Sequence, residues 1–107
     1  MNSFDKEITL EIKFVPKGWG FEKWKKCSWH YHELKDEVFY IQSGKVVVRY
    51  STGDQIERAT ERILGPGDNF HVFRGLRHQV EALEDTELFE FSTQHFDSDS
   101  YRILKGD

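Results

Sequence analysis

The sequence predicts an all-β fold, a barrel or sandwich of short strands. Short segments rich in β-branched and aromatic residues recur along the chain, and turn-forming residues separate them. No segment shows a convincing helical pattern. The length of 107 residues argues for a single domain, residues 1–107, with one hydrophobic core.

The first predicted strand covers residues 8–15. Apolar residues alternate there with polar ones, which is typical of a half-buried strand. Pro16 ends the strand because proline has no amide hydrogen to donate to a β-ladder. Residues 17–20 form a turn by composition, and the next predicted strand covers residues 28–32.

The middle of the chain predicts a hairpin. Residues 37–41 and 46–50 are strand-like and flank Gln42-Ser43-Gly44-Lys45, in which Gly44 can adopt the positive φ that the turn requires. Further strands are predicted after this hairpin at residues 60–64, 69–73, 78–83 and 86–93. We therefore expect a barrel over about residues 8–93 and a polar tail over residues 94–107.

Two histidines and a carboxylate in this region predict a metal site. His30 and His32 are two residues apart in a predicted strand, so their side chains point to the same face, about 6.6 Å apart at Cα. Two imidazoles at this spacing can reach one ion. Glu37 begins the next strand and is close enough to add an oxygen ligand. The residues thus predict three of the four protein ligands of a mononuclear metal site.

Two motifs around these residues resemble those of the cupins. Residues 30–44 read H-x-H, four residues, E, six residues, G, which resembles the first cupin motif. Residues 67–78 read G, five residues, F-R-G, two residues, H, which resembles the second. The resemblance implies a double-stranded β-helix, also called a jelly-roll barrel, and it adds His78 as the fourth metal ligand. The sequence departs from the pattern at Trp24, Phe73 and Ala82, where cupins have glycine, proline and asparagine.

The N-terminal part of the predicted barrel is short. About ten residues separate Gly20 from His30, and they can supply one strand but no hairpin. We therefore expect a barrel that lacks a hairpin near the N-terminus and has an open side. We also expect a homodimer, in which a second subunit covers this side by exchange of the strand at residues 8–15.

The predicted metal centre suggests several functions. Its ligands, His30, His32, Glu37 and His78, suit one divalent ion, which can be Mn, Fe, Ni, Co or Zn. Residues 18–22 and 90–102 are similar to segments of the cupin domain of type II mannose-6-phosphate isomerases. This similarity implies isomerase or epimerase chemistry on a sugar or sugar phosphate. An Fe(II) dioxygenase and a non-catalytic module that binds a sugar or another ligand are alternatives, so the sequence leaves open whether the protein is an enzyme.

Composition excludes several other classes of function. The net charge of −4 provides no basic surface for nucleic acid, and no apolar run is long enough to cross a membrane. One cysteine, Cys27, excludes an intramolecular disulfide. No signal peptide is visible, so we expect a cytoplasmic protein.

Other residues with chemical potential are expected to have structural roles. We expect His71 to be a core or rim residue and His95 to be solvated in the tail. The tryptophans Trp19, Trp24 and Trp29 are more consistent with packing or a dimer interface than with sugar stacking. Three cations near the expected barrel mouth suit phosphate contacts, but solvation at the rim is favoured for Lys35, Arg74 and Arg77.

Overall fold

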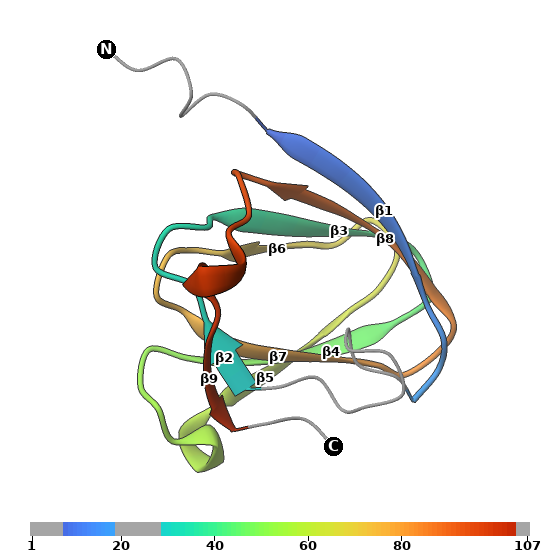
Figure 1. Ribbon diagram of the computed structural model, residues 1–107. Coiled ribbons are helices and arrows are strands. Elements are labelled where there is room, and N and C mark those ends of the chain that lie inside the picture. Colours follow the sequence, from blue (N-terminus) through green and yellow to red (C-terminus); the bar gives the residue numbers. More distant parts are fainter. Residues whose placement is uncertain (1–7, 19–28, 105–107) are drawn as a thin grey trace.

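The computed structural model describes residues 8–18 and 29–104 of the chain. Nine strands and two short 3-10 helices lie in these residues (Figure 1). The strands are β1 (Thr9–Val15), β2 (Trp29–Tyr31), β3 (Glu37–Ser43), β4 (Val46–Ser51), β5 (Thr60–Leu64), β6 (Asn69–Val72), β7 (Arg77–Ala82), β8 (Thr86–Ser92) and β9 (Tyr101–Leu104). The 3-10 helices are η2 (Ile56–Arg58) and η3 (Asp97–Asp99).

The strands form two sheets that face each other (Figure 1). One sheet has the order β1-β8-β3-β6 and the other has the order β5-β4-β7-β2-β9. All strand pairs are antiparallel. This arrangement is a jelly roll and confirms the predicted all-β class. Within the described residues, no helix is long and apolar enough to span a membrane.

The hydrophobic core lies between the two sheets. Alternate residues of the strands point inward, as the period of two requires. On β7, for example, His78, Val80 and Ala82 are all buried, while the residues between them are half-buried. The largest buried apolar side chains of the core cluster are those of Phe39, Ile41, Leu64, Phe70, Leu76 and Leu88.

The predicted hairpin of residues 37–41 and 46–50 is wrong, because β3 and β4 belong to different sheets and pair with other strands. The tight turn between the two strands is present, and Gly44 has a φ of +93°. This conformation is unfavourable for residues with a side chain. Gly44 also lies directly against the β7–β8 turn, where an added Cβ would collide with the carbonyl oxygen of Asp85 and with Thr86. Glycine is thus required at this position both by backbone conformation and by space.

The segment predicted as the first strand forms β1, but its orientation differs from the expected half-buried one. Its apolar side chains Leu10, Ile12 and Phe14 point outward and are exposed, whereas the polar residues alternate with them on the inward face. β1 pairs with β8 of the same chain over its whole length, from Thr9 opposite Ser92 to Val15 opposite Thr86. A single chain can therefore hold this strand without exchange.

The polar tail expected after residue 93 contributes to the barrel. Residues 101–104 form β9, which lies beside β2 at the edge of the five-stranded sheet. The expected missing hairpin concerns residues 19–28, which lie outside the described residues. What the sequence did not reveal is that β9 pairs with the histidine-bearing strand on the side away from β7.

Candidate metal site

Three predicted ligands come together between the sheets. One side-chain nitrogen from each of His30, His32 and His78 lies within 4.8 Å of the other two. The ring centroids of His30 and His78 are 4.4 Å apart, and that of His32 lies 5.1 Å from His30 and 5.6 Å from His78. His32 and His78 are buried and His30 is half-buried. Among these three rings in the described part of the chain, His30 is the most exposed.

Strand register explains the convergence. His30 on β2 is directly opposite His78 on β7, and opposite residues of antiparallel strands share a face. His32 follows the end of β2, where the amide of Gly75 donates a hydrogen bond to its carbonyl oxygen at 2.7 Å. The β2–β3 connection is thus attached to the β6–β7 turn, which brings the third ring to the other two.

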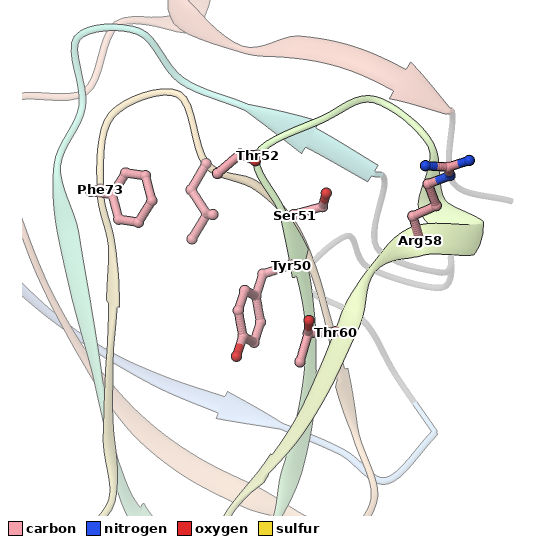
Figure 2. Close-up of a pocket in the computed structure, with 7 residues that line it drawn as sticks. Tyr50, Ser51, Thr52, Arg58, Thr60 and Phe73 are labelled. Atoms are coloured by element: carbon pink, nitrogen blue, oxygen red, sulfur yellow. The ribbon is translucent and has the colours of Figure 1, made fainter.

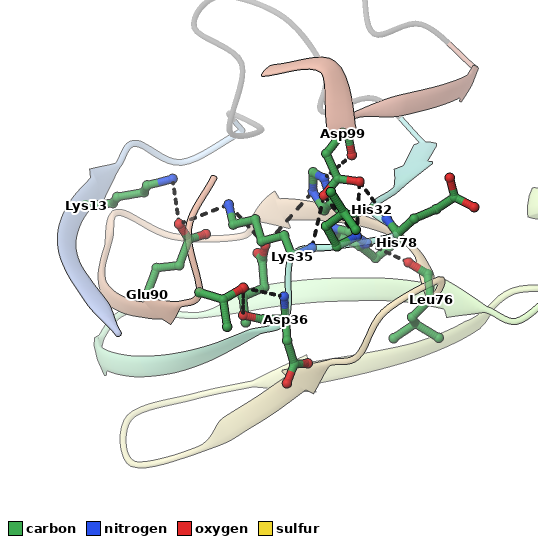
Figure 3. Close-up of polar contacts among 12 residues, drawn as sticks. Lys13, His32, Lys35, Asp36, Leu76, His78, Glu90 and Asp99 are labelled. Carbon is green, nitrogen blue, oxygen red and sulfur yellow. Dashed lines mark hydrogen bonds and ion pairs between the residues drawn. The ribbon is translucent and has the colours of Figure 1, made fainter. Parts of the chain in front are cut away.

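In His32 and His78, a hydrogen bond determines which ring nitrogen is available to bind a metal ion. Nδ1 of His32 is 2.9 Å from the carbonyl oxygen of Asp99, and Nδ1 of His78 is 2.9 Å from that of Leu76 (Figure 3). A carbonyl oxygen only accepts, so each Nδ1 donates, and a neutral ring then has its lone pair on Nε2. Metal-binding histidines commonly have this arrangement, in which a backbone carbonyl orients the ring.

The environment keeps these rings neutral, as metal binding requires. Burial lowers the pKa of His78 to about 4, and its hydrogen bond to Leu76 opposes this only in part. Burial also lowers the pKa of His32, with an opposing contribution from the hydrogen bond to Asp99 and a further lowering by the charge of Lys35. Both rings are therefore able to bind a cation near neutral pH.

The donor set fits a divalent metal ion. Two metal–nitrogen bonds of about 2.0–2.1 Å join nitrogens that are at most about 4.2 Å apart. The nitrogens of the cluster lie within 4.8 Å of one another, which is close to this limit. Small side-chain rotations would bring His30, His32 and His78 onto one ion. Three imidazoles suit the transition metals and zinc rather than Mg²⁺ or Ca²⁺.

The fourth predicted ligand, Glu37, lies beside the cluster but outside it. Its Oε2 is 4.0 Å from Nε2 of His32 and 3.2 Å from Nζ of Lys35. Glu37 and Lys35 are both buried. The lysine thus provides the positive charge that this carboxylate faces in the absence of metal.

Lys35 also contacts a second buried carboxylate. Its Nζ is 3.7 Å from Oε1 of Glu90, which in turn lies 3.5 Å from Nζ of Lys13 (Figure 3). Burial, together with the nearby charge of Glu37, raises the pKa of Glu90. Burial alone would lower the pKa of Lys35, but the two carboxylates outweigh it and raise that pKa. Lys35 is therefore a buried ammonium group, and the expected solvated role at the rim is wrong.

Asp99 attaches the C-terminal segment to the β2–β3 connection. Its buried carboxylate accepts hydrogen bonds of 2.9 to 3.1 Å from the amides of Glu33, Leu34 and Lys35. Burial would raise the pKa of Asp99, but these three hydrogen bonds prevail and lower it. The same residue accepts the His32 hydrogen bond through its carbonyl oxygen. Asp99 therefore orients a predicted ligand and was not singled out by the sequence.

Replacing Asp99 with alanine is expected to lower the free energy of unfolding by about 2–4 kcal/mol, because three amides lose a charged acceptor. We also expect metal affinity to fall about 10–100-fold, the usual effect of losing a group that orients a ligand. Urea denaturation and metal titration measure the two effects. Ser98→Ala, at an exposed position in the same 3-10 helix, is the control. Equal stability of the two variants would contradict the role of Asp99.

The metal-free protein is expected to lose stability as the pH falls from about 6.5 to about 4. Within this range the unfolded chain binds a proton at His78 that the folded protein excludes, because the folded pKa is lowered from 6.5 to about 4. At about 1.4 kcal/mol per pH unit, the loss is about 3 kcal/mol. Urea denaturation with a chelator at several pH values measures it. Constant stability down to pH 4.5 would contradict a neutral, buried His78.

A cavity of about 300 Å³ lies one residue away from the cluster along the sheet, and none of the three histidines lines it. Tyr50, which lines it, is directly opposite His78 on β7 and Thr60 on β5. The three side chains therefore form one row across the inner face of the sheet, and His30 continues this row. Figure 2 shows the lining residues, with Arg58 and Phe73 on opposite sides of Tyr50. The lining residues are Tyr50, Ser51, Thr52, Arg58, Thr60, Phe73 and Leu76.

The other histidines have different positions. His71 is an exposed rim residue, and its Nε2 lies 2.7 Å from Oδ1 of Asp36. His95 is exposed, as expected, but its ring centroid is only 6.3 Å from that of His32. Trp29 is fully buried and donates a hydrogen bond to the carbonyl oxygen of Asp54, which confirms its packing role.

The remaining candidates are two arginines and three residues outside the described part of the chain. Arg77 stacks on the ring of Tyr31 at 3.8 Å and pairs with Asp54. Arg74 is exposed, and its Nε donates to the carbonyl oxygen of Leu34. The expectations for Trp19, Trp24 and Cys27 lie outside the described residues.

Comparisons with known proteins agree with this fold. Residues 15–91 match the family described as Cupin domain. No curated protein sequence matches the chain significantly. Because the matched region covers most of the chain, the protein belongs to the cupin family, as its jelly roll and histidine cluster indicate.

Solved structures with the same fold include a capsular polysaccharide assembling protein and a sugar phosphate isomerase. CapF, a capsular polysaccharide assembling protein from Staphylococcus aureus, matches with a TM-score of 0.72 and 21% identity over 91% of this chain and 28% of its own. KdgF from Halomonas sp. matches with a TM-score of 0.67 and 22% identity over 86% and 73%. A cupin-superfamily sugar phosphate isomerase from Silicibacter pomeroyi matches with a TM-score of 0.64 and 19% identity over 83% and 52%. The chain thus spans less than a third of CapF, and these similarities concern the fold.

Proposed function

We propose that this protein is a metal-dependent cupin that isomerises or epimerises a sugar with an anionic group such as a phosphate. One observation carries the proposal: the histidine cluster and the cavity share a single row of side chains. Since Tyr50 lies between Thr60 and His78, a ligand in the cavity would lie next to the metal position.

The lining of the cavity suits such a ligand. Hydroxyl groups of Tyr50, Ser51, Thr52 and Thr60 match the hydrogen-bonding groups of a sugar. The guanidinium group of Arg58 has no hydrogen bond or ion pair with the described part of the chain, so it is available to an anion. Guanidinium groups bind phosphate and carboxylate through paired hydrogen bonds.

The proposed isomerisation would use the metal position and Arg58 in different roles. A divalent metal held by His30, His32 and His78 would supply a Lewis acid that polarises a carbonyl oxygen. The backbone carbonyls of Asp99 and Leu76 orient two of the rings, and Arg58 would position the anionic end of the substrate. The reaction transfers a proton between neighbouring carbon atoms and moves the carbonyl group, so it needs no oxidant or reductant. The Silicibacter pomeroyi sugar phosphate isomerase provides a precedent for such chemistry on this fold, at low identity.

The first experiment tests the reaction directly. The purified protein is reconstituted with Mn²⁺, Fe²⁺, Co²⁺, Ni²⁺ or Zn²⁺ and incubated in D₂O with mannose 6-phosphate or glucose 6-phosphate. We expect metal-dependent incorporation of deuterium next to the carbonyl group, detected by NMR, together with a change in sugar identity. The similarity to type II mannose-6-phosphate isomerases makes these the first substrates to test.

Controls separate this function from its alternatives. Arg58→Ala is expected to raise KM for the phosphorylated sugar at least tenfold, whereas Arg62→Ala, at a neighbouring position outside the cavity lining, leaves it unchanged. Thermal stabilisation by sugars without deuterium exchange would overturn the enzymatic proposal in favour of a binding module. Oxygen consumption by the Fe²⁺ form would overturn it in favour of a dioxygenase.

A further inference from the structure

The last described part of the chain is attached to the segment that carries two of the three histidines. We call residues 93–104 the C-terminal strap, and residues 29–36, which contain β2 and the β2–β3 connection, the histidine segment. The strap passes through η3 and ends in β9, and among the described strands β9 pairs with β2 alone (Figure 1). The strand that carries His30 thus holds β9 in the sheet.

Contacts along the strap lead repeatedly to the histidine segment. At its start, the amide of Thr93 donates to the carbonyl oxygen of Asp36 at 3.0 Å, and its hydroxyl oxygen accepts from the amide of Asp36 at 3.0 Å. In the middle, the carboxylate of Asp99 accepts hydrogen bonds from three amides of the β2–β3 connection. Near its end, the ring of Tyr101 stacks on that of Tyr31, with centroids 5.0 Å apart.

The histidine segment depends on the strap in return. β2 has three residues, and the pair that it forms with β7 is His30 opposite His78. Its ladder with β9 includes all three residues. The carbonyl oxygen of Asp99 also orients the ring of His32. Detachment of the strap would therefore remove most of the ladder of β2 and the group that orients a second ligand.

We propose that the C-terminal strap docks and detaches together with the histidine segment, and that docking and metal binding stabilise each other. A metal ion held by His30, His32 and His78 needs the docked arrangement, because this arrangement orients the rings. A ligand that binds one of two arrangements more tightly stabilises that arrangement by the same factor. The fraction of molecules with a docked strap thus sets the apparent metal affinity. This inference uses the candidate metal site but not the proposed isomerisation.

Hydrogen exchange of backbone amides, followed by NMR, tests the coupling in the full chain with a chelator and with saturating Zn²⁺. Two strap amides report docking, those of Thr93 and Asp99, which donate to the carbonyl oxygens of Asp36 and Phe96. The second acceptor lies within the strap, so the Asp99 amide reports the order of the strap itself. We expect Zn²⁺ to slow exchange of both amides by about tenfold or more. The amide of Leu83, hydrogen-bonded just beyond the other end of β7, is the control and should be unaffected.

A variant that leaves every histidine in place tests whether the two segments open together. Tyr101→Ser removes the stack on Tyr31 and should accelerate exchange about 3–10-fold in the metal-free protein, the range expected for the loss of an aromatic pair. The acceleration should be equal at the amide of Thr93 in the strap and at that of Glu33 in the histidine segment. Ile63→Ser, at an exposed position of β5, is the matched control and should change neither rate. If Tyr101→Ser does not fold, Tyr101→Leu replaces it.

Calorimetric titration establishes that Zn²⁺ binds. Binding without slower exchange of the Asp99 amide would overturn the coupling and leave the metal site and the proposed function untouched. A natural protein that binds no Zn²⁺ would overturn the coupling together with the metal site. Acceleration in Tyr101→Ser that is confined to the strap, with the Glu33 amide unchanged, would also overturn it, because the two segments would then open separately.

Discussion

Replacing His32 with alanine is expected to abolish metal binding at micromolar metal concentrations. The loss in affinity should exceed 100-fold, because removal of a group that merely orients a ligand already costs about 10–100-fold. His78→Ala should have the same effect, since both rings present Nε2 to the cluster. Elemental analysis of the purified protein and calorimetric titration with Mn²⁺ or Zn²⁺ measure the effect.

His71→Ala is the control for both variants, because this exposed histidine lies outside the cluster and should leave metal affinity unchanged. Glu37→Gln separates a site of three imidazoles from one that also uses the carboxylate. A loss of affinity as large as in His32→Ala would show that Glu37 is a ligand of the bound metal. Full metal content in both His32→Ala and His78→Ala would refute the site.

Lys35→Met is expected to lower the free energy of unfolding of the metal-free protein by about 3–5 kcal/mol. The substitution leaves the carboxylates of Glu37 and Glu90 buried without their shared cation, and breaking a buried ion pair by removing one partner costs about this amount. We also expect Mn²⁺ or Zn²⁺ to raise the Tm of the variant more than that of the natural protein, because the metal can replace the lost positive charge beside Glu37. Thermal denaturation with and without metal measures both effects.

Lys45→Met is the control, since Lys45 forms an exposed ion pair with Glu84 and should change stability by less than about 1 kcal/mol. Equal stability of Lys35→Met and Lys45→Met would mean that the buried carboxylates are protonated or solvated without the lysine. A metal-induced rise in Tm that is smaller in Lys35→Met than in the natural protein would contradict the competition between lysine and metal.

Local patterns predicted most of the fold. Alternation and β-branched residues located the strands, since a pleated strand with one buried face imposes a period of two. Gly44 located a turn that requires a positive φ, but the strands on either side of this turn enter different sheets and form no hairpin. The alternation of apolar and polar residues does not determine which face of a strand is buried, and for β1 the expected orientation was wrong. The ion pair between Lys13 and Glu90 decides that orientation, and it joins residues 77 positions apart.

The candidate site was predictable to the extent that its residues follow strand geometry. His30 and His32 were identified by their spacing, and His78 by resemblance to a family motif. Asp99 and Lys35 were not identified, because their roles depend on contacts between the C-terminal segment and the β2–β3 connection. A single aspartate in a polar segment has no local signature that distinguishes a buried acceptor from a solvated side chain.

The contact between Asp99 and the β2–β3 connection has a consequence for biosynthesis. On the ribosome, His30 and His32 emerge long before the aspartate that orients one of them, since Glu33 and Asp99 are 66 positions apart. A nascent chain that already contains the histidines therefore still lacks the ordered loop. The carboxylate that holds the β2–β3 connection in place is therefore among the last parts of the fold to be synthesised.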